Sequence, residues 1–97
     1  MKAFVVAAET VTDDAMFAAY RKKVPATLEA FGGRFVARGG GLTILEGEWP
    51  HLRLVIIEFP SRAAAEASYQ SDEYQRIIGL RHESSIGNLI IVDAHVD

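Results

Sequence analysis

Three segments of the chain would each form a strand with apolar side chains on both faces. They are residues 3–8, 52–59 and 89–96. In the second of them, Leu54 and Ile56 would point to one face while Val55 and Ile57 point to the other. A strand with one face in water alternates apolar and polar residues instead. We therefore expect a sheet whose two faces are both buried.

A helix is predicted after the first strand, because apolar residues recur there at helical spacing. The stripe consists of Phe17, Tyr20, Val24, Leu28 and Phe31. Thr12 is a plausible N-cap, and Gly32 is placed to end the helix in the left-handed conformation. Pro25 lies within this segment and crowds the carbonyl of Arg21, so we expect a kink or a restart there.

The rest of the chain is predicted to continue with strands, turns and short helices. Residues 33–38 form a strand with Phe35 and Ala37 on one face and Arg34, Val36 and Arg38 on the other. Residues 39–41 are a glycine turn, and residues 42–46 form a short return strand. Ser61 caps a helix at residues 62–69, and Ser71 caps another whose stripe is Tyr74, Ile77, Ile78 and Arg81. Residues 84–88 are expected to be a loop before the last strand.

This order, β-α-β-(β)-β-α-β, is typical of the ferredoxin-like α+β arrangement: a four-stranded antiparallel sheet with both helices on one face. One helical layer covers only one face of the sheet, so the second apolar face needs another cover. We expect a second copy of the chain to supply it, with the two subunits packed sheet to sheet as a homodimer. The alternative is a monomer that exposes a small apolar patch.

Composition narrows the class of protein further. The 97 residues are enough for a single domain, residues 1–97, and they include no cysteine, which excludes disulfides and thiol nucleophiles. The net charge of −3 argues against nucleic acid as a partner. The apolar stretches are all far shorter than the ~20 residues that span a bilayer. We therefore expect no membrane association and a cytoplasmic location.

Glu58 is the candidate catalytic residue, because it interrupts an otherwise apolar strand. Burial there would raise the pKa of its carboxyl and suit it to proton transfer. The alternative is a structural ion pair or a strand-end position near water. Arg53 is an odd number of residues away and so lies on the opposite face of the strand. Arg38 or Arg81 is therefore the expected partner.

Six residues are candidates for ligand binding: Tyr20, Arg38, Glu46, Arg53, Tyr74 and Arg81. The arginines could recognise a small anion through bidentate hydrogen bonds. Arg38 and Glu46 flank the glycine turn, where they could instead form a structural pair across a hairpin. For Arg81 the alternative is a cation at a helix end. Tyr20 and Tyr74 lie on buried stripes, and each hydroxyl would bind either a ligand or a backbone carbonyl.

Metal and cofactor sites are not indicated by the sequence. His51, His82 and His95 lack the spacing of metal ligands, and Asp93 with His95 makes only a weak pair. The glycine turn is not followed by the lysine and hydroxyl residue of a phosphate-binding loop. We therefore expect neither a metal nor a cofactor.

Two blocks of the sequence resemble domain-of-unknown-function family 1330. The first is Gly-Gly-Arg-Phe-x-x-Arg-Gly-Gly at residues 32–40, and the second is Arg-x-Val-x-x-Glu-Phe-Pro-Ser at residues 53–61. Residues 45–49 and 71–75, with Arg81, extend the resemblance over nearly the whole chain. It implies a dimeric α/β barrel of two ferredoxin-like subunits and no established activity. The wider superfamily includes cofactor-independent monooxygenases, small isomerases, haem-handling enzymes and amino-acid-sensing modules, and the fold alone does not choose among them.

Three functions remain open at this level. The first is a homodimer that binds a small molecule, such as an anion, in a cleft between helices and sheet. The second is a cofactor-independent enzyme, an isomerase or a monooxygenase-like catalyst, in which Glu58 transfers a proton and an arginine stabilises an oxyanion. The third is a structural dimer without a ligand.

Overall fold

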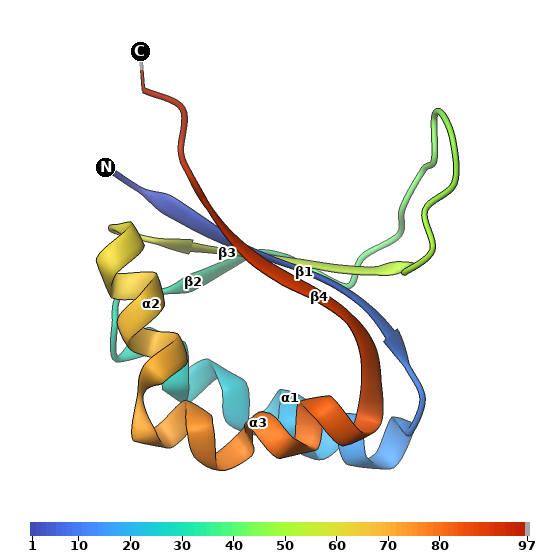
Figure 1. Ribbon diagram of the computed structural model, residues 1–97, viewed down its shortest axis with the longest axis horizontal. Coiled ribbons are helices and arrows are strands. Elements are labelled where there is room, and N and C mark those ends of the chain that lie inside the picture. Colours follow the sequence, from blue (N-terminus) through green and yellow to red (C-terminus); the bar gives the residue numbers. More distant parts are fainter. Residues whose placement is uncertain (97) are drawn as a thin grey trace.

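The computed structural model describes residues 1–96 and places one layer of helices against one face of a four-stranded antiparallel sheet (Figure 1). The elements are β1 (Ala3–Val11), α1 (Asp14–Glu29), β2 (Arg34–Arg38), β3 (Arg53–Phe59), α2 (Arg62–Gln70), α3 (Asp72–Ser84) and β4 (Ser85–Asp93). The strand order in the sheet is β2-β3-β1-β4, with every pair antiparallel. The predicted ferredoxin-like α+β fold is thus confirmed.

Two segments differ from the prediction. Residues 42–46 form no return strand but belong to a long loop, residues 39–52, in which almost every side chain is exposed. The three glycines that open this loop supply no side chains to pack and add backbone freedom, which works against a paired strand. The expected loop at residues 84–88 is absent, because β4 begins at Ser85 directly after α3. There it pairs with Val11 and then follows β1 along its whole length.

The helix boundaries follow side-chain caps. Asp13, not Thr12, caps α1, since its carboxylate accepts a hydrogen bond from a backbone N–H of the first turn at 3.0 Å. Helix α1 continues through Pro25 to Glu29, so the restart, one of the two expected outcomes beside a kink, is wrong. The predicted caps Ser61 and Ser71 are confirmed at the starts of α2 and α3.

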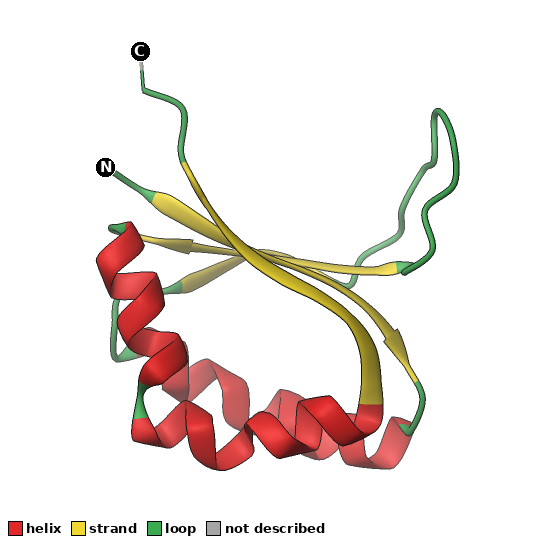
Figure 2. Cartoon of the chain, in the orientation of Figure 1, coloured by secondary structure: helices red, strands yellow, loops and turns green. Residues whose placement is uncertain are grey.

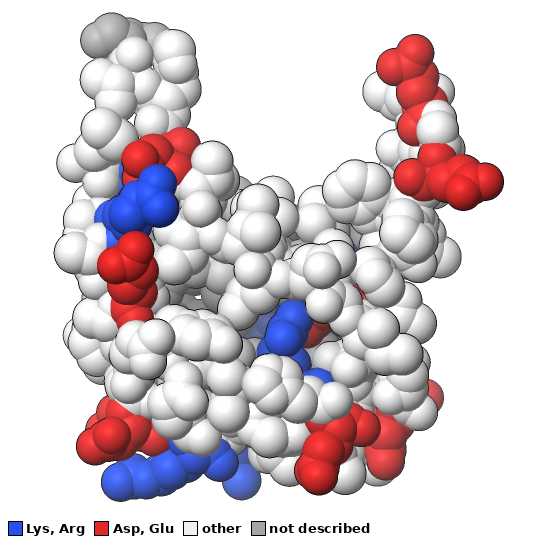
Figure 3. Space-filling model, in the orientation of Figure 1, with Lys and Arg blue, Asp and Glu red and all other residues white. Residues whose placement is uncertain are grey.

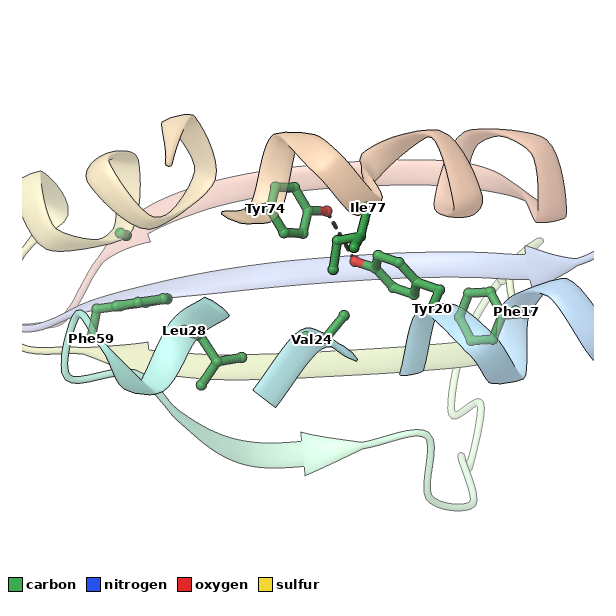
Figure 4. Packing of buried hydrophobic residues seen from close by; sticks show 8 residues of the cluster. Phe17, Tyr20, Val24, Leu28, Phe59, Tyr74 and Ile77 are labelled. Carbon is green, nitrogen blue, oxygen red and sulfur yellow. Dashed lines mark hydrogen bonds between the residues drawn. The ribbon is translucent and has the colours of Figure 1, made fainter. Parts of the chain in front are cut away.

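The core lies between the helices and the sheet. Its buried cluster is Phe17, Tyr20, Val24, Leu28, Phe59, Ala65, Tyr74 and Ile77. Figure 4 shows Tyr20 of α1 and Tyr74 of α3 pointing toward each other, with Phe59 of β3 in the same cluster. The helices thereby cover one face of the sheet, and they hold the aromatic side chains that line the candidate site.

The other face of the sheet, here called the open face, is apolar and uncovered. Val6 pairs with Ile56 on one side and with Ile90 on the other, which forms an apolar row across three strands. Ile90 and Ile86 are 56% and 64% exposed. The loop of residues 39–52 and the C-terminal residues rise on this side, away from the helices (Figure 2). Both faces of the sheet are therefore apolar, as expected, while the helices cover one of them.

Within residues 1–96, no helix combines the length and the apolar character needed to cross a membrane.

Candidate functional site

A cavity of about 70 Å³ lies between the helices and the sheet. Most of its lining is apolar, but polar side chains also reach it, among them Glu9, Tyr20, Arg38, Arg53, Tyr74 and Arg81. Figure 3 shows Lys and Arg atoms inside the hollow between the sheet and the helix layer. Of the six residues predicted to bind a ligand, five line this cavity, and Glu46 does not.

Glu9 is the buried carboxylate of the site. It lies on the helix-facing side of β1 and is only 3% exposed. Its Oε2 lies 3.0 Å from Nε of Arg81, and its Oε1 lies 3.5 Å from Nε of Arg53, the residue paired with it in β3. The first strand was predicted over residues 3–8, which left Glu9 outside it. The signal that could have identified it is its strand parity, because Glu9 shares a face with Ala3 and Ala7, both buried.

Two buried N–H groups of these arginines make no well-formed hydrogen bond. Nη2 of Arg81 has no acceptor, and Nε of Arg53 has only the distant Oε1 of Glu9, at 3.5 Å. A buried donor without an acceptor costs about 1–3 kcal/mol. Burial also lowers the pKa of the Arg53 guanidinium, and repulsion from Arg21 adds to this effect. This end of the cavity is therefore positively charged and short of acceptors, a combination that suits an anion.

Arg38 reaches the cavity because β2 contains a β-bulge at Val36. A regular strand would place Arg38 on the same face as Arg34, as the sequence predicted. The extra residue shifts the register, so that Arg38 lies opposite the buried Val55 while Arg34 lies opposite Glu58. The bulge therefore separates two arginines that strand parity would have kept together.

Pro25 explains how Arg38 is held. Because proline has no N–H, the carbonyl of Arg21, four residues earlier in α1, lacks its usual helical donor. Nη2 of Arg38 donates to that carbonyl at 2.8 Å, and its guanidinium lies 4.1 Å from the ring centroid of Phe35. Burial lowers the pKa of Arg38, with repulsion from Arg21 and Arg53 as further causes. The proline thus creates the acceptor that positions a cavity arginine.

Tyr20 and Tyr74 bind each other. Their hydroxyl oxygens lie 2.9 Å apart, and their rings meet edge to face with centroids 6.3 Å apart. Each hydroxyl was expected to bind either a ligand or a backbone carbonyl. In the structure the two hydroxyls bind each other instead. Burial raises the pKa of both hydroxyls. Both therefore remain protonated hydrogen-bond donors.

The other two candidates lie away from the cavity. Glu58 is on the open face, where Arg34 donates to it at 2.8 Å and Lys2 lies 3.5 Å away. The hydrogen bond from Arg34 lowers the pKa of Glu58, so the expectation of a raised pKa is wrong. Neither expected partner, Arg38 or Arg81, contacts Glu58. The alternative of a structural ion pair is confirmed, with Arg34 as the partner. Glu46 is exposed in the loop, where no hairpin brings it opposite Arg38. Among residues 1–96, no group of three or more potential metal ligands lies together.

Comparison with known proteins identifies a family and a fold. A family model described as domain of unknown function (DUF1330) matches residues 2–95. No curated protein matches the chain. A crystal structure of a protein of unknown function from Rhodopseudomonas palustris is similar at a TM-score of 0.79 and 18% identity, covering 99% of this chain and 84% of that one.

Two further structures extend this comparison. SnoaB from Streptomyces nogalater, described as a cofactor-independent oxygenase, has a TM-score of 0.69 and 14% identity, covering 99% of this chain and 95% of SnoaB. A dimeric ferredoxin-like protein of unknown function from Jannaschia sp. CCS1 has a TM-score of 0.62 and 16% identity, covering 99% of this chain and 100% of that one. At these identities the similarity concerns the fold alone.

Proposed function

Since the chain belongs to the DUF1330 family, a domain of unknown function, no reaction follows from its family, and we propose from its own cavity that it binds a small organic anion. The observation that supports this proposal is the pair of buried N–H groups on Arg53 and Arg81 that make no well-formed hydrogen bond. A carboxylate offers two acceptor oxygens and a negative charge to such donors. Glu9 already holds both guanidinium groups in place, so the donors are positioned before the ligand arrives.

The apolar part of the lining would receive the body of the ligand. Val24, Val55 and Ile57 are among the side chains that face the cavity. By the volume that one buried water requires, 70 Å³ holds roughly five to seven atoms of water size. We therefore take a short carboxylic acid such as butyrate as the probe.

Isothermal titration calorimetry tests this proposal with butyrate and its neutral analogue butyramide. We expect butyrate to bind and butyramide to bind at least tenfold more weakly, because only the anion satisfies both guanidinium groups. Arg53→Met should weaken butyrate binding at least tenfold. Arg76→Met is the matched control, because it removes an exposed arginine from α3 and changes the net charge equally. Equal binding of butyrate and butyramide, or no binding of either, would refute the proposal.

The geometry supports binding better than it supports proton transfer. Glu58 lies across the sheet from the cavity and is engaged with Arg34 and Lys2. Glu9, the carboxylate inside the cavity, contacts a guanidinium group with each of its oxygens. Both acids are therefore already engaged by cationic side chains of the protein itself.

We further infer that a second copy of the chain covers the open face. The apolar row of Val6, Ile56 and Ile90 is the kind of surface that monomers rarely expose. Burying several hundred Å² of it per subunit would contribute on the order of ten kcal/mol before association costs. Two of the similar structures, including the Jannaschia protein, are described as dimeric, which supports this arrangement.

Light scattering coupled to size exclusion tests the dimer. We expect the wild-type protein to elute at twice the chain mass of 10.6 kDa. Ile90→Asp should elute as a monomer, because it places a charge in the centre of the interface. Ala63→Asp adds the same charge on the exposed side of α2 and should remain dimeric. A wild-type protein of single-chain mass at micromolar concentration would exclude the dimer.

A further inference from the structure

The tyrosine pair gives the cavity a second hydrogen-bond donor. With 2.9 Å between the two oxygens, one hydroxyl donates and the other accepts. Each hydroxyl carries one hydrogen, so the accepting hydroxyl keeps its own. Residues 1–96 supply no further hydrogen-bond partner to the hydroxyl of Tyr20 or to that of Tyr74. One buried O–H hydrogen is therefore unused.

This hydrogen lies in the same cavity as the arginine donors. Tyr74 and Arg81 are seven residues apart on α3, which places them on the same face of the helix, two turns from each other. Tyr20 approaches from α1, and Figure 4 shows the two hydroxyls meeting between the helices. Both tyrosines line the cavity together with Glu9 and Arg81. The charge of Arg81 affects the pKa of both hydroxyls, which agrees with this proximity.

The other buried hydroxyls of the lining are already committed. Thr27 donates to the carbonyl of Val24 at 2.7 Å, and Ser68 donates to the carbonyl of Thr27 at 3.1 Å. The carboxylate oxygens of Glu9 face the two guanidinium groups. The buried groups left without a well-formed hydrogen bond are therefore donors: one N–H on each arginine and one O–H of the tyrosine pair.

We propose that the ligand is an oxo acid, whose carboxylate binds Arg53 and Arg81 while its carbonyl oxygen accepts the free hydrogen of the Tyr20–Tyr74 pair. This inference rests on the proposed anion binding and adds the class of anion. A carbonyl oxygen brings acceptors and no hydrogen, so it complements a cavity that presents unused donors. An amino acid would instead bring an ammonium group close to two arginines, where charge repulsion opposes it.

Calorimetry on the wild-type protein tests the proposal with four-carbon acids. The probes are butyrate, 2-oxobutyrate, 3-oxobutyrate and 2-aminobutyrate, which share the four-carbon chain and the carboxylate and differ in the presence, kind or position of a second functional group. We expect the better of the two oxo acids to bind at least tenfold more tightly than butyrate, and 2-aminobutyrate to bind more weakly than butyrate. Equal affinities for butyrate and both oxo acids would overturn the inference and leave anion binding intact. Failure of all four acids to bind would overturn the proposed function itself.

The double variant Tyr20→Phe/Tyr74→Phe assigns the preference to the hydroxyl pair. Both hydroxyls are removed at once, which leaves neither unpaired and keeps the packing of the rings. The affinity for the preferred oxo acid relative to butyrate, both measured on this variant, should fall to twofold or less. Tyr69→Phe, which removes the hydroxyl of the third tyrosine that lines the cavity, should retain the preference. An oxo-acid preference that survives the double variant, or disappears in Tyr69→Phe, would overturn the assignment.

Discussion

Replacing Glu9 by glutamine should destabilise the protein by about 3 kcal/mol, because breaking one side of a buried ion pair costs about 3–5 kcal/mol. The substitution leaves the side chains of Arg81 and Arg53, which are 10% and 19% exposed, without a counter-charge. We take the lower end of the range because the contact to Arg53 is the longer one, at 3.5 Å. For a domain of this size, a loss of about 3 kcal/mol lowers the melting temperature by roughly 12–24 °C.

Urea unfolding followed by far-UV circular dichroism measures this loss, with all variants at the same concentration because dimerisation affects apparent stability. Arg81→Met and the double variant with Glu9→Gln complete a cycle. The double variant should lose less stability than the sum of the losses of the two single variants, because it removes the charge from both sides of the contact. Glu66→Gln, an exposed acid on α2, should stay within about 0.5 kcal/mol of the wild type. A similarly small loss of stability for Glu9→Gln would contradict the conclusion that Glu9 neutralises the charges of Arg53 and Arg81.

Three further substitutions test other parts of the structure. Gly39 has φ of +71°, and an added Cβ would overlap the guanidinium of Arg53. Gly39→Ala should therefore cost about 1–2 kcal/mol in thermal melts and weaken butyrate binding, whereas Gly41→Ala, which meets open space, should change neither property. The lowered pKa of Glu58 means that its stabilisation is present above its ordinary value of 4.5 and is lost as pH falls through the folded-state value. Melting temperatures of Glu58→Gln should accordingly fall less than those of the wild type between about pH 5 and pH 3; parallel curves would contradict the ion pair. Burial raises the pKa of Tyr20 above its ordinary value of 10, so its contribution to stability is present below pH 10 and is lost in stronger alkali. Tyr20→Phe should leave the phenolate absorbance of the folded protein unchanged at about pH 11, and a drop in that absorbance would show that Tyr20 ionises normally.

Strand parity predicted much of the site, and it failed where the backbone departs from regularity. Parity placed Arg53 and Glu58 on opposite faces of β3, and the structure confirms this. It misplaced Arg38, because nothing in the local sequence marks Val36 as the extra residue of a bulge. The bulge is a property of the pairing between β2 and β3, so a single strand read alone does not reveal it.

Glu9 was missed for a different reason. An acid after an apolar run is more often the end of a strand than part of a core, and here β1 continues to Val11. Its burial depends on Arg81, which is 72 residues away in sequence, and on Arg53 in another strand. Such a long-range neutralisation has no local signature, whereas the apolar stripes and the serine caps of α2 and α3 do, and those were predicted correctly.

The bulge in β2 makes the placement of Arg38 tolerant of the loss of a single codon. Deleting Val36 would remove only the unpaired residue, so Ala37 would stay opposite Ile56 and Arg38 opposite Val55. Arg38 would still face the cavity, and Arg34 would still face the open side of the sheet. Relatives that lack this residue would therefore keep the same cation in the cavity and the same charge on the surface inferred to meet the second subunit.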